Sequence, residues 1–195
     1  MKKASLLLLA IALLMGIVSG TAAAQAAPAA GVGDNSVYFV SYFSNNVAAA
    51  PDATVRFIND GDTGANLWAS IYVFDDSQEL TECCACVITP DGLLSESVKT
   101  QLTAFPITGK VPTRGVIKVI SSSTGDPTNV YPTAGLRGWA THIQGPTKNV
   151  YSITETMFAD SNLVGAEKAL LQNLCYYDAL LSGLPCTCTP EDHDF

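Results

Sequence analysis

The sequence has few charged residues, and basic residues are the scarcest of them. Lys, Arg, Asp and Glu make up 14% of the chain, against about 25% in an average soluble protein. There are 10 basic and 18 acidic residues, for a net charge of −8. A chain of this charge repels the phosphates of nucleic acids and anionic lipid headgroups. We therefore expect no nucleic-acid binding and no membrane association of the mature form.

Motifs of catalysis are also missing. The chain contains no Gly-x-Ser-x-Gly nucleophile motif and only two histidines, His142 and His193. Glu155 is the one acidic residue well inside a predicted strand, which is too little to define a pair of catalytic carboxylates. A strand histidine such as His142 is more often structural than catalytic. The sequence thus predicts a protein that is not an enzyme and has no cofactor.

Long apolar runs are limited to the N-terminus. Two lysines precede apolar residues 6–18, and the alanine-rich segment that follows offers A-x-A sites ending at Ala24 or Ala26. This is the pattern of a secretory signal peptide, which we assign to residues 1–26. The run is shorter than the roughly 20 residues that span a bilayer. We expect a secreted protein, extracellular or periplasmic, cleaved near one of these alanines.

Cleavage would leave a more acidic chain. Removing the two lysines leaves 8 basic residues against 18 acidic ones, a net charge of −10. Residues 27–35 are mostly Ala, Gly and Pro, which predicts a flexible leader. Residues 36–195 are long enough to form one domain with its own hydrophobic core.

Short apolar stretches separated by Gly, Pro, Asn and Asp dominate this domain. Two of them, 37–43 and 67–74, are apolar on both faces, as in strands covered on two sides. We expect residues 53–59 and 67–74 to form a hairpin or a nearby pair, and the last two strands to form a second hairpin. The predicted strands are residues 37–43, 53–59, 67–74, 94–102, 115–120, 136–144 and 150–158.

The strand predicted at residues 94–102 is expected to be buried on one side only. Leu94, Val98 and Leu102 would point inward, while polar side chains between them would face solvent. Such a one-sided pattern is typical of a strand near the edge of a sheet.

The periodicity changes to that of a helix near the C-terminus. Gly183 and Pro185 would end such a helix, so we predict one amphipathic helix at about residues 165–182. The expected fold is mainly β, an antiparallel β-sandwich, Ig-like or jelly-roll-like, with one C-terminal α-helix and disulfide staples. The apolar residues that recur at spacings of three and four are Leu170, Leu171, Leu174, Cys175, Ala179 and Leu181.

The six cysteines fall into two groups of three. In an exported chain an even number of cysteines predicts disulfides. If all six oxidise within one chain, a bond inside one group requires a bond inside the other, so at least one bond joins the groups. Tight rings exclude neighbouring cysteines as partners, which leaves about eight plausible pairings. We interpret residues 79–93 as a loop stapled to a cysteine-rich tail. The two groups are Cys83, Cys84 and Cys86, and Cys175, Cys186 and Cys188.

A soft-metal site is the alternative use of these thiols. Cys-x-Cys and Cys-Cys-x-Cys resemble ligand sets for copper(I) or zinc, which His142 or His193 could complete. An oxidising compartment favours disulfides, so we expect no bound metal.

Two acidic segments resemble calcium ligands only in part. Residues 60–64 read Asp-Gly-Asp-Thr-Gly, but the glycine comes one position early for an EF-hand loop, and Ile71 stands where the bidentate Glu belongs. Asp75 and Asp76, with the two glutamates that follow, read as a solvated acidic turn. Polar turns explain both segments.

Four stretches carry a resemblance to known sequences: residues 55–59, 71–76, 78–93 with its Cys-Cys-x-Cys motif, and 115–118. Together they resemble uncharacterised secreted bacterial proteins that share a Cys-Cys-x-Cys loop. The resemblance implies export and a shared disulfide-bonded fold, and it implies no activity.

The function expected is that of a structural or interaction protein of the cell surface or extracellular matrix. In the most specific version of this hypothesis, residues 37–43 pair with the sheet edge of a second copy or of another surface protein. A glycan- or protein-binding module, using loops such as residues 127–135 with Tyr131, is the alternative.

Overall fold

The computed structural model describes residues 36–148, 150–181 and 186–188. The predicted signal peptide, the predicted leader, and Gly183 with Pro185 lie outside the described residues. In the part of the chain that is described, no helix has the length and hydrophobicity needed to cross a membrane.

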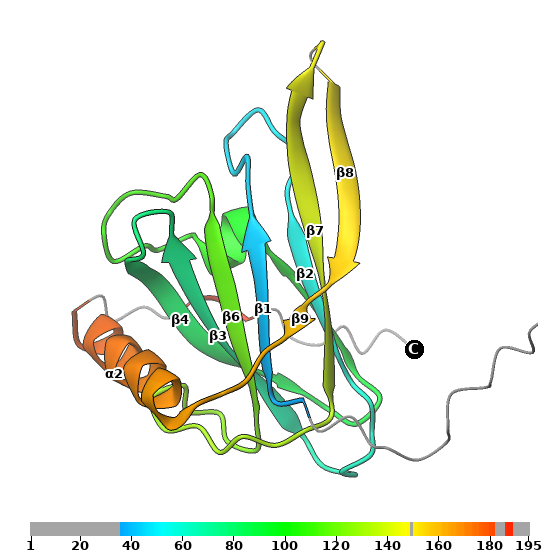
Figure 1. Ribbon diagram of the computed structural model, residues 1–195, viewed down its shortest axis with the longest axis vertical. Helices are drawn as coiled ribbons and strands as arrows, with labels where there is room; N and C mark the ends of the chain where they lie inside the picture. Colours follow the sequence, from blue (N-terminus) through cyan, green and yellow to red (C-terminus); the bar gives the residue numbers. More distant parts are fainter. Residues whose placement is uncertain (1–35, 149, 182–185, 189–195) are drawn as a thin grey trace, which may run out of the picture. The chain divides into compact units, whose positions relative to one another are not determined.

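The described residues form two antiparallel sheets and one long helix (Figure 1). The first sheet, sheet A, has the strand order β4-β3-β6-β1-β9, and the second, sheet B, has the order β5-β2-β7-β8. The prediction of an antiparallel β-sandwich with one C-terminal helix is confirmed. The elements are β1 (Tyr38–Phe43), β2 (Thr54–Asn59), β3 (Leu67–Asp75), β4 (Leu80–Ile88), β5 (Leu93–Ser97), a π-helical turn (Val98–Leu102), β6 (Gly115–Ser122), β7 (Leu136–Thr147), β8 (Val150–Met157), β9 (Ala159–Asp160) and α2 (Gly165–Leu181).

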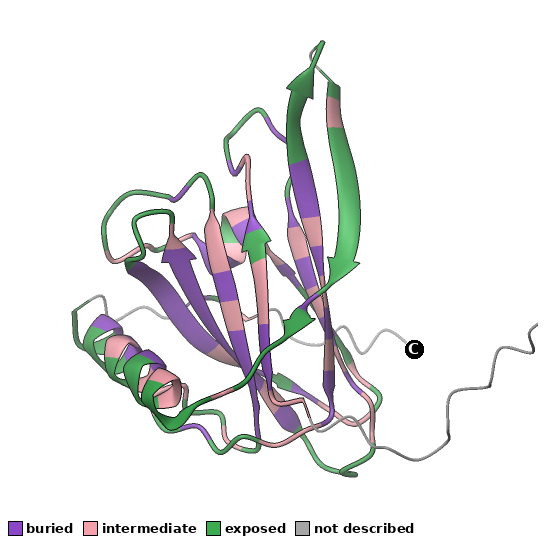
Figure 2. Cartoon of the chain, in the orientation of Figure 1, coloured by how far each residue is buried: buried purple, intermediate pink, exposed green. Residues whose placement is uncertain are grey.

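The main core lies between the inner faces of the two sheets. Alternate residues of each strand point into it, as period-two patterning requires, and Figure 2 shows the resulting alternation of buried and less buried positions along the strands. In β3, for example, Ala69, Ile71 and Val73 belong to this core. Fully buried members from other strands include Phe43, Val55, Phe57, Ile88, Leu94, Ile117 and Val119.

A second, smaller core lies between the outer face of sheet A and α2. The other face of β3 contributes Tyr72 and Phe74 to it, and α2 contributes Leu171 and Cys175. Strand β3 is therefore covered on both sides, as its sequence predicts, and it lies inside sheet A between β4 and β6. The helix occupies only part of sheet A, and sheet B has no helix on its outer face (Figure 1).

The expected hairpin of residues 53–59 and 67–74 is wrong. Strand β2 lies in sheet B, between β5 and β7, whereas β3 lies in sheet A. The polar turn at 60–64 therefore crosses from one sheet to the other. The Asn59 side chain supports this crossing, because its amide nitrogen donates to the carbonyls of Ala65 and Ile88. The second expected hairpin, β7 with β8, is confirmed.

The interpretation of residues 79–93 as a loop is also wrong, because most of this stretch is strand β4. It pairs with β3 from Leu67↔Ile88 to Phe74↔Leu80. Only one edge of β4 is occupied by a neighbouring strand, since it ends sheet A. The three cysteines of the first group are thus set along a rigid edge strand.

The strand predicted at residues 94–102 is shorter than expected. It ends at Ser97, and a π-helical turn follows, in which the Ser97 hydroxyl accepts a hydrogen bond from the Thr100 amide at 2.9 Å. Leu94, Val98 and Leu102 are buried as predicted. Residues four apart share a face in a strand as well as in a helical turn, so this spacing predicts the burial and does not distinguish the two structures.

Strand β1 pairs within its own chain. It pairs with β6 along its whole length, and β9 covers Phe39 and Val40 on its other side. Residues 37–43 could pair with another molecule only if their backbone hydrogen bonds to β6 or β9 were broken and replaced.

Candidate functional site: the disulfide-anchored helix and its outer face

The alternation of β4 sends its cysteines to opposite faces of sheet A. Cys83 points outward and belongs to the core under α2, whereas Cys84 and Cys86 point inward and belong to the core between the sheets. Successive strand residues always alternate in this way. Three neighbouring cysteines are therefore divided into one on the helix side and two on the sandwich side.

Each face of β4 binds a different part of the C-terminal segment. On the helix side, Cys83 forms a disulfide with Cys175 in α2. On the sandwich side, the tail cysteines Cys186 and Cys188 bond to Cys84 and Cys86, respectively. All three disulfides join the two groups, and none lies within a group. The expectation that disulfides link the first group to the C-terminal segment is confirmed.

The first of these disulfides, with two polar contacts, anchors α2 on sheet A. Near the start of the helix, Glu167 accepts from Lys118 Nζ at 2.6 Å and from the Tyr38 hydroxyl at 2.9 Å. Near its end, Cys175 is bonded to β4. The Lys118 and Tyr38 partners lower the pKa of Glu167. The helix is thus fixed at two points about two turns apart, roughly 12 Å along its axis.

Two buried acids lie near the C-terminal half of α2, one on the helix and one on β4. Asp178 Oδ2 is 3.5 Å from Cys83 Sγ, and Glu82, on the other face of β4, accepts a hydrogen bond from the Phe105 amide. Burial raises the pKa of Glu82 to about 7, the Phe105 amide opposes this rise, and the nearby Asp178 charge adds to it. Because of its burial, Glu82 titrates close to neutral pH.

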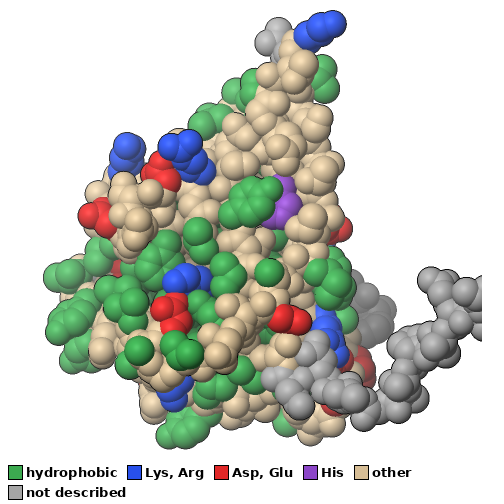
Figure 3. All heavy atoms as spheres, viewed as in Figure 1, with side chains coloured by type: hydrophobic (Ala, Val, Ile, Leu, Met, Phe, Trp, Pro, Cys, Tyr) green, Lys and Arg blue, Asp and Glu red, His purple; other side chains and the backbone are tan. Residues whose placement is uncertain are grey.

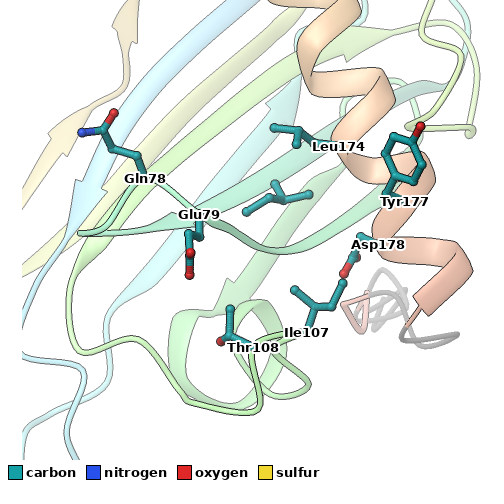
Figure 4. Close-up of a pocket in the computed structure, with 8 residues that line it drawn as sticks. Gln78, Glu79, Ile107, Thr108, Leu174, Tyr177 and Asp178 are labelled. Carbon is teal, nitrogen blue, oxygen red and sulfur yellow. The ribbon is translucent and has the colours of Figure 1, made fainter.

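A hollow of about 490 Å³ opens beside these acids, between α2, the β3–β4 turn and residues 107–108 (Figure 4). Leu174, Tyr177 and Asp178 line it from the helix, and Ile107 and Thr108 line it from the facing loop. A second hollow joins Leu181 to the same loop, between residues 104 and 111. The end of the helix and this loop therefore form one continuous surface.

The outward side of α2 is apolar and exposed. The helix buries only a narrow stripe, Leu171, Cys175 and Asp178. Two leucines that the predicted stripe includes, Leu170 and Leu181, are 49% and 75% exposed. We use the name α2 surface for the seven large apolar side chains exposed on the helix and the adjoining loop: Leu170, Tyr176, Tyr177, Leu180, Leu181, Phe105 and Val111. Figure 3 shows hydrophobic side chains gathered over the position of α2.

The α2 surface carries almost no charge. Between Leu170 and Leu181 the only ionisable acid or base is Asp178, and it is buried. Lys110, in the adjoining loop, lies at the rim of the surface. Large exposed apolar patches are typical of interaction sites.

His142 has a structural place in the fold. It is buried, its Nε2 lies 2.7 Å from the Thr156 hydroxyl, and the Tyr42 ring stacks on it at 4.1 Å between centroids. Burial lowers its pKa, and the Tyr42 backbone opposes this only in part. None of the described hollows near α2 includes this histidine.

The acidic segments form turns, as predicted. In the turn at 60–64, the Asp60 carboxylate accepts from the Asp62 amide at 3.2 Å, and Gly61 has a φ of 79°, which favours glycine. In the β3–β4 turn, Asp75 accepts from the amides of Ser77 and Glu79. These carboxylates therefore stabilise the turns in which they lie.

Tyr131, which we considered for glycan binding, lies on a different element from Trp139. Tyr131 is 58% exposed in its loop, and the neighbouring Val130 anchors that loop in the core under α2. Trp139 is half-buried on β7, where it pairs with Met157 of β8. The two rings lie on different elements.

Comparison of the chain with protein-family models, with curated proteins and with solved structures gave no match. The candidate site is therefore defined by the geometry of this chain alone.

Proposed function

We propose that the chain is an exported, non-catalytic structural protein that associates with a second copy of itself through the α2 surface. The observation that carries this proposal is a helix that a disulfide, a half-buried ion pair and a tyrosine hydrogen bond hold on sheet A while its outward side stays apolar. A helix held this firmly presents a preformed face, so little conformational entropy is lost on binding.

The size of the α2 surface suits a dimer. Its seven side chains are 45–75% exposed, and at about 150–250 Å² for a large side chain they present on the order of 700 Å² of apolar area. Stable interfaces bury about 800 Å² per partner. The largest apolar patch of an ordinary monomer is about 300–600 Å².

The lack of charge on the helical part of the α2 surface fits a second copy as the occupant. A molecule with a net charge of −10, as expected after cleavage of the signal peptide, repels its own copies, and close approach costs least where the surface is uncharged. The α2 surface is such a place, and a two-fold axis would bring tyrosines and leucines of one copy against the same residues of the other. Tyr is enriched among the residues that contribute most to such interfaces.

Sedimentation velocity of the secreted protein tests the proposal. The double substitution Tyr177→Ser and Leu180→Ser removes two central side chains of the α2 surface, and we expect it to weaken association about tenfold or more. The matched control is Tyr131→Ser, since Tyr131 is as exposed as Tyr177 but lies outside the α2 surface. Equal sedimentation of the double variant and the control at every concentration would refute the proposal.

A soft-metal site is the second candidate, because three sulfurs lie close together. The sulfurs of Cys84, Cys86 and Cys188 are within 4.8 Å of one another. In this structure no described cysteine is free, so such a site would require prior reduction of the disulfides. One equivalent of copper or zinc, with free thiols in the secreted protein, would support it.

A further inference from the structure

Strand β8 is an edge strand with one side open along its whole length. Among the described residues it is the last strand of sheet B and pairs only with β7. Seven of its eight residues are exposed, and only Tyr151 is half-buried. Figure 1 shows that the tip of the β7–β8 hairpin extends beyond the neighbouring strands, and Figure 2 shows β8 exposed over nearly all of its length.

The open edge of β8 lacks the features that usually protect edge strands. Proteins block such edges with lysine, proline, bulges or very short strands. Strand β8 is eight residues long and contains no lysine, proline or glycine. The register shift of the hairpin lies near its tip, between Gln144 and Thr147 of β7, and leaves β8 itself regular. Its single charge, Glu155, forms an ion pair with Arg56 of β2.

We infer that β8 pairs antiparallel with β8 of a second copy, which joins two four-stranded sheets into one continuous sheet. An antiparallel pair satisfies the unpaired backbone groups of both edges with the same residues. The occupant is a second copy because the edge is uncharged apart from the already paired Glu155, so no like charges meet along most of its length.

The side-chain pattern favours a register centred on Ile153. Directly opposed residues lie on one face of a sheet, and Ile153 is already opposite Ile143 in β7. Ile153 is 57% exposed, and in this register it meets Ile153 of the second copy. The same register places Tyr151 opposite Glu155 of the second copy, so the two Glu155 carboxylates do not face each other.

The β8 edge and the α2 surface lie on different sheets and use different residues. If the proposed function also holds, each copy has two different two-fold contacts, and such contacts propagate into extended assemblies. This consequence rests on the proposed function, whereas the pairing of β8 does not.

Four forms of the secreted protein, compared by sedimentation velocity, separate the two contacts. The first three are the unchanged chain, Ile153→Lys, and the Tyr177→Ser, Leu180→Ser double variant; the fourth combines all three substitutions. A lysine at residue 153 places two positive charges together at the two-fold axis. The matched control is Leu93→Lys, because Leu93 is 54% exposed on β5, the opposite edge of sheet B.

We expect species larger than dimers for the unchanged chain and for Leu93→Lys, dimers for Ile153→Lys and for the double variant, and monomers for the combined variant. Hydrogen exchange in residues 150–157 should slow as the concentration of the double variant rises. A monomeric double variant with concentration-independent exchange in β8 would overturn the β8 inference and leave the α2 contact standing. If the unchanged chain and the double variant are both dimers and Ile153→Lys alone is monomeric, β8 pairing is supported and the proposed function is refuted.

Discussion

Glu82 is the residue whose ionisation bears most directly on stability. It is fully buried in β4 with one hydrogen bond from the Phe105 amide, and burial raises its pKa from an ordinary 4.5 to about 7. The folded state therefore holds a proton that the unfolded state has released at intermediate pH. Stability is fully present below about pH 4.5 and falls as the pH rises through 7.

The size of this effect can be estimated. A difference of about 2.5 pKa units corresponds to about 3 kcal/mol at roughly 1.4 kcal/mol per unit. We expect the free energy of unfolding to fall by about this amount between pH 4.5 and pH 8. Glu82→Gln keeps an acceptor for the Phe105 amide and removes the charge, so it should flatten this dependence and raise the stability at pH 8.

Urea unfolding at several pH values measures the effect. Glu79→Gln, at an exposed position three residues earlier, is the control and should leave the pH dependence of the native chain unchanged. If Glu82→Gln unfolds with the same pH dependence as the native chain, Glu82 is not protonated in the fold.

Single residues also show where sequence reasoning succeeded and where it failed. The alternation of Val55 with Phe57 predicts their burial correctly, because strand period alone decides it. The helical period of α2 misleads in part, since it includes Leu170 and Leu181 in the buried stripe. Periodicity shows that leucines share a side of a helix, but only the position of the sheet decides which side is covered.

At the scale of elements, β4 is the informative failure. Three cysteines within four residues suggest a loop, yet Thr81, Val87 and Ile88 around them are β-branched, as in a strand. As a strand, the segment would have placed Cys83 on one face and Cys84 with Cys86 on the other. The spacing of Cys186 and Cys188 is then the same as that of the inward-pointing Cys84 and Cys86. Which cysteines form disulfides with each other depends on this alternation, and the number of cysteines alone does not reveal it.

The Cys83–Cys175 disulfide should govern how firmly α2 is held. Changing Cys175 to Ser leaves the Glu167 contacts at the start of the helix but releases its C-terminal half from β4. We expect a loss of about 2–5 kcal/mol, as for native disulfides in small exported domains. Hydrogen exchange should quicken in residues 170–181 while β3 and β6 remain protected.

The control for this prediction removes a different disulfide. Cys86→Ser with Cys188→Ser removes one of the two disulfides of the tail, and α2 should keep its protection because Cys83–Cys175 is intact. Cys83→Ser with Cys175→Ser repeats the helix release without leaving a free thiol. Unchanged exchange in α2 in both helix variants would show that packing alone holds the helix.

At the scale of the whole molecule, composition and patterning were sufficient for the fold class. Short apolar runs between turns predict a β-sandwich, and the change of period predicts the closing helix. Which strands share a sheet was not predictable, since β2 and β3 have compatible patterns but lie in different sheets. The α2 surface was not predictable either, because its exposure depends on where the helix packs.

Tyrosine footprinting at increasing protein concentration tests the central claim, association through the α2 surface, most directly. Tyr176 and Tyr177 are 53% and 61% exposed within that surface, and Tyr131, at 58%, lies outside it. Iodination followed by mass spectrometry measures all three in one sample. We predict that labelling of Tyr176 and Tyr177 falls as the protein associates, while that of Tyr131 stays constant. Equal labelling of the three tyrosines at every concentration, in a sample whose association is shown by sedimentation, would contradict the account.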